Sequence, residues 1–170
     1  MVTVAVLSFG LSPALAKKSP KTKIGFVDLN MIMSKLDDGR SAKKKFQRAM
    51  KRRKSRFLKK QKEVEALKIK LEKTLKTKKP TELKTQFTKY QKKVQGLQKY
   101  YQSSQKRLHT LRKKTFGPIF NRLTALVQLV SERNGVTLML ERQKSGLLSA
   151  SEKIDYSGQV IKAYEGLKGK

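Results

Sequence analysis

The sequence predicts an α+β protein that is mostly α, with a long antiparallel coiled-coil hairpin arm projecting from a small β-strand body that associates between subunits. Three observations carry this prediction. Two long segments repeat apolar residues at steps of three and four, a break containing Pro80 separates them, and short runs of β-forming residues stand near both ends. Such distant strands can pair only if the two helical segments fold back on each other.

The N-terminal sixteen residues differ in composition from the rest of the chain. MVTVAVLSFGLSPALA has no charged side chain, ends in the A-x-A cleavage pattern Ala14-Leu15-Ala16, and is too short to span a bilayer. We expect residues 1–16 to be a signal peptide with an incomplete basic n-region, which is removed on export. The alternative is a buried N-terminal strand. Residues 17–23 are expected to form a basic linker.

The first part of the body is expected over residues 24–40. Ile24 to Leu29, IGFVDL, is rich in β-forming residues and predicts a short strand. A helix should follow from about Asn30, with Gly39 as a local weak point because glycine lowers helix stability.

The hairpin arm is expected over residues 41–115. Pro80 is favoured in a first helical turn, so the second helix should begin there after the polar break KTKKP. Helices of about 40–45 residues would give an arm roughly 60–70 Å long. The seam of the first helix is predicted at Met50, Phe57, Val64 and Leu71, with the partly polar positions Phe46, Arg53, Lys60, Leu67 and Thr74 between them. The seam of the second is predicted at Leu83, Phe87, Tyr90, Val94, Leu97, Tyr101, Ser104, Leu108 and Leu111.

Residues 116–170 are expected to complete the body. Pro118 should kink or interrupt the second helix, and Asn134-Gly135 should end it. Val136 to Leu140, VTLML, predicts a second strand, and Gly146 to Ala150, GLLSA, predicts a weaker third one.

A short last helix closes the predicted body. Asp155 or Ser157 can cap it, and its apolar face is expected to be Val160, Ile161, Tyr164 and Leu167. One copy of this body buries little apolar surface, so association between copies is expected.

The charge of the chain is strongly unbalanced. Its 170 residues include 42 basic and 12 acidic side chains, a formal net charge of +30, and residues 41–115 alone hold 28 basic and 4 acidic ones, a net of +24 (28 − 4). A helix that is merely soluble usually pairs Glu with Lys four residues apart, because like charges at that spacing cost stability. We therefore expect an anionic client or an anionic surface as partner. A structural coiled-coil spacer with a solvated basic face is the alternative.

Several kinds of chemistry are excluded or unsupported. The absence of Cys excludes disulfides, thiolate metal sites and Cys nucleophiles, and His109, the one histidine, cannot form a histidine cluster. The sequence contains no Gly-rich phosphate loop and neither H-E-x-x-H nor G-x-S-x-G. We expect no enzyme activity, cofactor or metal, and we expect His109 to be an exposed helical residue.

Two stretches carry a resemblance to a known family. KIGFVDLNMIMSKLDDGRSAKKKF, residues 23–46, resembles the N-terminal signature of the OmpH/Skp family of periplasmic chaperones: a K-I-[AG]-[FYV]-V-D strand, then a helix with a Gly before an A-K-K run. The C-terminal stretch NGVTLMLERQKSGLLSASEKIDYSGQVIKAYEGL is similar to the family's ending of two strands, an I-D-x-[ST] cap and a V-I-K helix.

The resemblance implies a periplasmic homotrimer, in which a β body carries three helical arms around a cavity that holds unfolded outer-membrane proteins without ATP. Residues 24–29, 136–140 and 146–150 would build the body, and residues 41–115 the arm. The chain departs from the family in its more basic arm, in the polar seam of its first helix, and in Pro118 at the root of the arm.

Candidate contact residues follow from these patterns. Phe and Met side chains adapt to varied apolar partners, and cationic side chains attract anionic partners. Packing in the seam between the two helices is the more ordinary role of Phe46, Met50 and Phe57. Tyr90 and Tyr101 are expected in the seam and Tyr100 at the surface. The candidates for client binding are Phe46, Met50, Arg52, Arg53, Arg56, Phe57, Lys60, Tyr100 and Arg107, and those for oligomerisation are Ile24, Phe26, Val27, Val136, Leu138, Leu140 and Leu147.

The sequence therefore favours an ATP-independent periplasmic holdase chaperone that prevents aggregation. Its expected partners are other copies of itself, unfolded outer-membrane proteins, and lipopolysaccharide or an anionic membrane surface. The alternative is a basic, histone-like nucleic-acid-binding protein. Because no base-reading motif is present, its nucleic-acid binding would be non-specific.

Overall fold

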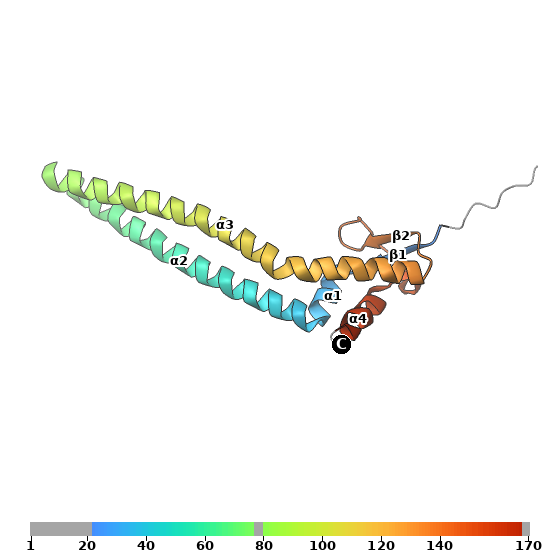
Figure 1. Cartoon of the computed structure of the whole chain (residues 1–170). Coiled ribbons are helices and arrows are strands. Elements are labelled where there is room, and N and C mark those ends of the chain that lie inside the picture. Colours follow the sequence, from blue (N-terminus) through green and yellow to red (C-terminus); the bar gives the residue numbers. More distant parts are fainter. Residues whose placement is uncertain (1–21, 77–79, 168–170) are drawn as a thin grey trace, which may run out of the picture.

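The computed structural model describes residues 22–76 and 80–167. The chain is mostly helical, and α2 and α3 form a long hairpin that projects from a small strand pair, as predicted (Figure 1). The predicted signal peptide, residues 17–21 of the linker and residues 77–79 lie outside the described residues. In chain order the elements are β1 (Ile24–Val27), α1 (Leu29–Lys35), α2 (Asp37–Lys76), α3 (Pro80–Arg133), β2 (Leu138–Glu141), the 3-10 turn η1 (Glu152–Ile154) and α4 (Ser157–Gly166).

The two ends of the described chain meet in a parallel strand pair. β1 pairs with β2 in a register that runs from Ile24 opposite Leu138 to Val27 opposite Glu141. On its other edge, β1 receives a hydrogen bond of 2.9 Å from the Tyr156 N–H to the Phe26 carbonyl. The predicted return of the chain through the hairpin is therefore confirmed, and it brings the N- and C-terminal segments together.

The prediction of a third strand over residues 146–150 is wrong. Gly146 has a φ of 71°, and residues 147–150 form no regular element. Leu148 is fully exposed. After β2 the backbone winds into a turn instead of reversing along the free edge of that strand: the Ser145 N–H donates to the Glu141 carbonyl at 3.0 Å, and the Glu141 carboxylate accepts from the N–H groups of residues 143 and 144.

The core of the body packs α1, α3 and α4 together beneath the strands. Ile32, Leu123 and Val160 are completely buried. Tyr164 of α4 is also buried, and its hydroxyl donates a hydrogen bond of 2.9 Å to Asp38 of α2. Burial, and then this hydrogen bond, raise the pKa of the Tyr164 hydroxyl. The N-cap of the last helix is Tyr156, not Asp155 or Ser157 as expected; Asp155 accepts a hydrogen bond from the Ser157 N–H, and the Ser157 hydroxyl accepts one from the Asp28 N–H.

The corner between α1 and α2 depends on Gly39. α1 ends at Lys35, and Leu36, in extended backbone, separates it from α2. Gly39 is not a weak point but lies inside the first turn of α2, where a Cβ would stand 2.0 Å from the Met33 carbonyl oxygen. Only glycine permits this approach of α1 to α2 without a shift of the backbone.

The hairpin is built from the two longest helices. α2 has 40 residues and α3 has 54, and α3 begins at Pro80 as predicted. At 1.5 Å per residue, the 40 residues of α2 extend about 60 Å. α3 is not interrupted at Pro118; it continues through this residue and bends near the body (Figure 1). Pro118 lacks the N–H that would bond the carbonyl four residues earlier, which accounts for the bend.

Within residues 22–76 and 80–167, no helix is long and apolar enough to cross a membrane.

Candidate functional site

The arm, which we define as residues 41–115 and of which the structure describes 41–76 and 80–115, carries a large excess of positive charge. Residues 41–115 contain 28 basic and 4 acidic side chains, so carboxylates can pair with only a few of the cations. Lys93 of α3 donates a 2.7 Å hydrogen bond to Glu63 of α2, and this bond and the charge of Lys93 lower the pKa of the Glu63 carboxyl. A second ion pair, of Lys68 with Glu72, is loose at 3.9 Å. The arm therefore presents a mostly uncompensated positive field.

The seam between α2 and α3 is partly polar, as the sequence predicted. Arg53 and Lys60 are half-buried in it. The Tyr100 hydroxyl donates to the Arg53 carbonyl at 3.4 Å, and the Lys60 ammonium lies 5.6 Å from the centre of the Tyr100 ring. Among the described residues, the Arg53 Nε and the Ser104 hydroxyl are buried without a hydrogen-bond partner. Such atoms lower the stability of the seam.

The predicted seam is displaced by one residue at three places, and Val94, which was also predicted in the seam, is 36% exposed. Met50, Phe87 and Tyr101 were expected inside, but they are 49%, 48% and 52% exposed. The preceding residue takes each seam position instead: Ala49 is buried, and Gln86 and Tyr100 are half-buried. The prediction that Tyr100 lies off the seam is therefore wrong. Gln86 is held there by a 2.9 Å hydrogen bond from the Thr74 hydroxyl.

These displaced residues leave apolar side chains along one side of the arm. Phe87, Val94, Tyr101 and Leu108 are seven residues apart and so lie on one face of α3. The Tyr101 ring contacts the Phe57 ring of α2 with 5.9 Å between their centres. Met50 lies seven residues before Phe57, and Leu75 lies eighteen after it, which is five turns. We call this surface the apolar flank: Met50, Phe57, Leu75, Phe87, Val94, Tyr101 and Leu108.

Near the body the apolar flank widens into a groove, the root groove. Its apolar lining includes Met50 and Leu108 and continues with three aromatic rings, of which Phe46 and Phe116 meet edge to face at 5.9 Å. Cationic side chains border it. The full lining is Phe46, Met50, Gln105, Leu108, His109, Arg112, Lys113, Phe116, Gly117 and Phe120. His109 is exposed on its helix, as expected.

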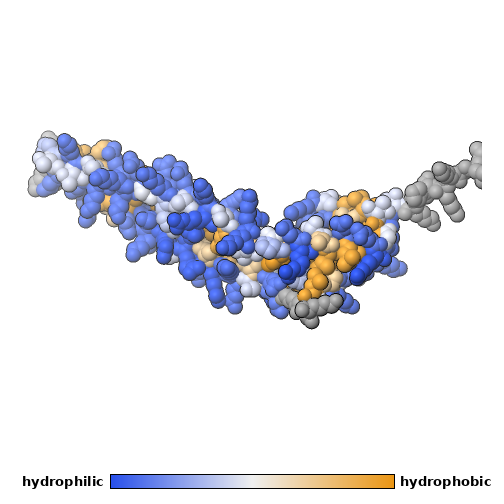
Figure 2. Space-filling view, viewed as in Figure 1, coloured by the Kyte–Doolittle hydropathy of each residue, from blue (hydrophilic) through white to orange (hydrophobic). Residues whose placement is uncertain are grey.

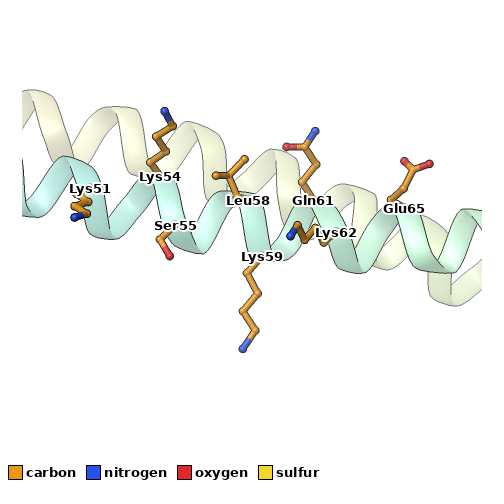
Figure 3. A pocket seen from close by; sticks show the side chains of 8 residues that line it. All are labelled: Lys51, Lys54, Ser55, Leu58, Lys59, Gln61, Lys62 and Glu65. Carbon is orange, nitrogen blue, oxygen red and sulfur yellow. The ribbon is translucent and has the colours of Figure 1, made fainter.

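The outward face of α2 combines lysines with one exposed leucine. Leu58 lies in a shallow hollow bordered by Lys51, Lys54, Lys59 and Lys62. Figure 3 shows Lys54 and Leu58 rising on one side of the helix and Lys59 extending on the opposite side. Figure 2 shows the same character on a larger scale, since the arm is mostly hydrophilic with small hydrophobic patches and the body carries larger ones.

The remaining sequence-predicted candidates fall into distinct environments. Arg52, Arg56 and Arg107 are exposed on the arm, whereas Phe46 and Phe57 are half-buried between its helices. Among the oligomerisation candidates, Ile24 and Leu138 are about half exposed, and Leu140 and Leu147 are half-buried. Phe26, Val27 and Val136 are buried within their own chain. Among residues 22–76 and 80–167, no three His, Asp or Glu side chains gather as metal ligands would.

Comparison with known proteins agrees with this geometry. A family model described as outer membrane protein (OmpH-like) matches residues 23–164. Among solved structures, the chain is similar to one from Caulobacter crescentus CB15 that is described as an OmpH-like outer membrane chaperone, with a TM-score of 0.62 and 15% identity over 96% of this chain and 92% of that one. At this identity, the similarity concerns the fold. No curated protein matches the chain.

Proposed function

Because the chain belongs to the OmpH-like family of outer membrane proteins, we propose that it is a chaperone that binds unfolded outer-membrane proteins without ATP and prevents their aggregation. The observation that carries the proposal is the combination, on one arm, of a net charge of +24 with an apolar flank in which five of the seven side chains are exposed. The structural neighbour's description as an outer membrane chaperone supports the same function.

The two features of the arm have different roles. Long-range attraction by the uncompensated cations raises the rate at which chains with net negative charge reach the arm. Met50, Phe87 and Tyr101 then shield apolar segments of the client through many weak contacts, since Met and aromatic side chains fit varied partners. The stems of neighbouring lysines cover further apolar surface while their ammonium groups stay in water.

We propose that the working form is a homotrimer in the periplasm, joined through the body. Ile24 and Leu138 lie opposite each other in the strand pair and are 45% and 47% exposed, which suits burial between copies. Phe26, Val27 and Val136 support this surface from within the chain. The molar mass of the assembly, measured by light scattering during gel filtration, tests the proposal. The double variant Ile24→Lys, Leu138→Lys should convert the trimer to a monomer.

The decisive experiment for the function measures aggregation of a client. The chain from Lys17 is mixed with a urea-unfolded outer-membrane β-barrel protein, the urea is diluted, and light scattering is followed at about 0.15 M and 0.5 M salt, where the screening length falls from about 8 Å to less than 5 Å. The proposal predicts suppressed aggregation near three chains per client, weakened but retained at high salt, because the apolar contacts persist.

A second candidate function is non-specific nucleic-acid binding, which the excess of cations on the arm favours. Phosphate contacts alone would give a steep linear fall of log affinity with log salt concentration. If the chain fails to suppress aggregation at any ratio but binds duplex DNA tightly with such a slope, the chaperone function is refuted. Binding of lipopolysaccharide or anionic lipid vesicles, which the same cations permit, is measured in parallel.

A further inference from the structure

The spacing of the apolar flank defines the shape of what it can bind. Phe87, Val94, Tyr101 and Leu108 recur every seven residues, so their side chains stand about 10.5 Å apart along α3. On α2, Met50 and Phe57 repeat at the same interval. The contact between the Phe57 and Tyr101 rings joins the two rows on one side of the hairpin. The flank is thus a heptad row of four residues on α3 joined to a shorter row on α2, and the two rows end together at the root groove, which Met50 and Leu108 line.

Heptad register matches a helix better than an extended chain. A helix with apolar residues at alternating steps of three and four presents one layer every 10.5 Å or so, in step with the flank. A strand presents side chains on one face about every 6.6–6.8 Å, which does not match the 10.5 Å interval of the flank. Only every third side chain on that face of a strand would coincide with a flank residue. A third helix laid along the flank would cover the apolar side chains that the two helices leave exposed.

The charge of the arm restricts the occupant further. A second copy of the arm would bring another +24 against the first, so self-association along this flank is opposed. Cations also stand beside the apolar residues: Arg112 and Lys113 line the root groove with Met50 and Leu108. Carboxylates on both borders of an incoming helix would meet these cations.

We propose that the apolar flank, with the root groove at its end, is a docking surface for an acidic amphipathic helix of another protein, whose apolar residues follow a heptad repeat. This goes beyond the holding of unfolded clients, because the occupant is an ordered helix in a defined register. Its apolar residues pack on Phe87, Val94 and Tyr101, and its Glu and Asp side chains face the lysines and arginines of the arm.

The test uses a fluorescent acidic peptide of about four heptads with Leu at the a and d positions and Glu at most others. A control peptide has the same composition with its Leu residues alternating at period two. Binding to the chain from Lys17 is followed by anisotropy, and helix formation by circular dichroism. The heptad peptide should bind at least roughly tenfold more tightly than the control and gain helix on binding.

Matched variants locate the site. Phe87→Gln, Val94→Gln and Tyr101→Gln together should weaken binding of the heptad peptide by roughly tenfold or more. The control variant, Leu58→Gln with Ile69→Gln, changes two α2 residues that are each 46% exposed. They lie three turns apart on the outward face of α2, roughly 100–120° around the helix from Phe57. The control variant should bind the heptad peptide within about twofold of the unchanged chain, because it changes none of the flank residues.

Three results would overturn the proposal. One is equal binding of the two peptides, which would indicate attraction by charge or capture of an extended chain. Another is equal weakening by the flank and control variants, and the third is binding without gain of helix. The single variant Val94→Gln, which removes only one half-exposed side chain, gives the same comparison if the triple variant unfolds. Suppression of client aggregation is read separately, so its loss and the loss of peptide docking are distinguishable.

Discussion

The corner at Gly39 permits a sharp test of the structure, because two glycines of the hairpin helices should respond to alanine with opposite signs. In an ordinary helix interior, replacing Gly by Ala stabilises the fold by about 0.8–1 kcal/mol. Gly96 of α3 has nothing within 4 Å of an added Cβ, so Gly96→Ala should follow this rule. At Gly39, the same methyl group would stand 2.0 Å from the Met33 carbonyl oxygen and 2.8 Å from its carbonyl carbon.

The size of the destabilisation by Gly39→Ala depends on how far the backbone must move. Ordinary contacts of a Cβ begin at 3.4 Å, so α1 and α2 must separate by more than 1 Å at this point. Overpacking of this kind costs about 1–3 kcal/mol, and a backbone carbonyl cannot rotate away as a side chain can. Because the clash is with backbone, the cost should lie near the upper end of that range, about 3 kcal/mol; the gain in helix propensity offsets about 1 kcal/mol of it, so we expect Gly39→Ala to lower the free energy of unfolding by about 2 kcal/mol.

The assay is urea unfolding followed by circular dichroism at 222 nm, with all variants at one protein concentration because association makes the midpoint concentration-dependent. Gly39→Ala should unfold at lower urea than the unchanged chain, and Gly96→Ala at higher urea. If Gly39→Ala is as stable as the unchanged chain, the close approach of α1 to α2 does not fix the corner and the reasoning fails.

Three further predictions concern single side chains. Tyr164→Phe should lower the free energy of unfolding by about 1–2 kcal/mol at neutral pH. The raised pKa of Tyr164 gives stability that is complete below the ordinary pKa of about 10 and is lost as the pH rises through the pKa of the folded state. In urea titrations above pH 10, the difference in stability between the unchanged chain and Tyr164→Phe should therefore shrink. Lys93→Gln should raise the pKa of the Glu63 carboxyl toward its ordinary value in an NMR titration, with no measurable change in the urea midpoint; an unchanged pKa would contradict the ion pair. Leu123→Ala should cost about 2–5 kcal/mol in the same urea assay, and Leu129→Ala, on the same helix but partly exposed, clearly less; equal losses would contradict the packing of α3 in the body.

The hairpin could be predicted from the sequence because its signals are local. Pro80 marks the start of a helix, and steps of three and four define an apolar stripe over many turns. The phase of that stripe could not be predicted to one residue. Adjacent residues lie only 100° apart around a helix, so either Ala49 or Met50, and either Tyr100 or Tyr101, can face the partner helix. The prediction assigned Met50 and Tyr101 to the seam, and the structure exposes both.

The body was predicted less completely, because its strands depend on partners distant in the sequence. The pairing of β1 with β2 was inferred from their positions at both ends of the hairpin and is confirmed. The stretch from Gly146 to Ala150 has similar composition, but the backbone after β2 winds into a turn at Glu141 to Ser145 and does not run back along that strand, so composition alone misassigned it. The division of the chain into an arm over 41–115 and a body over 24–40 and 116–170 stays a prediction, as do the roles of the named contact residues.

Binding of clients on the apolar flank can be measured by finding which surface of the chain a client touches. A photoreactive benzoylphenylalanine is placed either at Tyr101 on the apolar flank or at Lys162, an exposed residue of α4 on the body. A urea-unfolded outer-membrane protein is diluted into each variant and irradiated. We expect strong cross-linking from position 101 and little from position 162, with both variants still suppressing aggregation. Equal cross-linking from both positions, or none from position 101 while the client stays soluble, would contradict binding on the apolar flank.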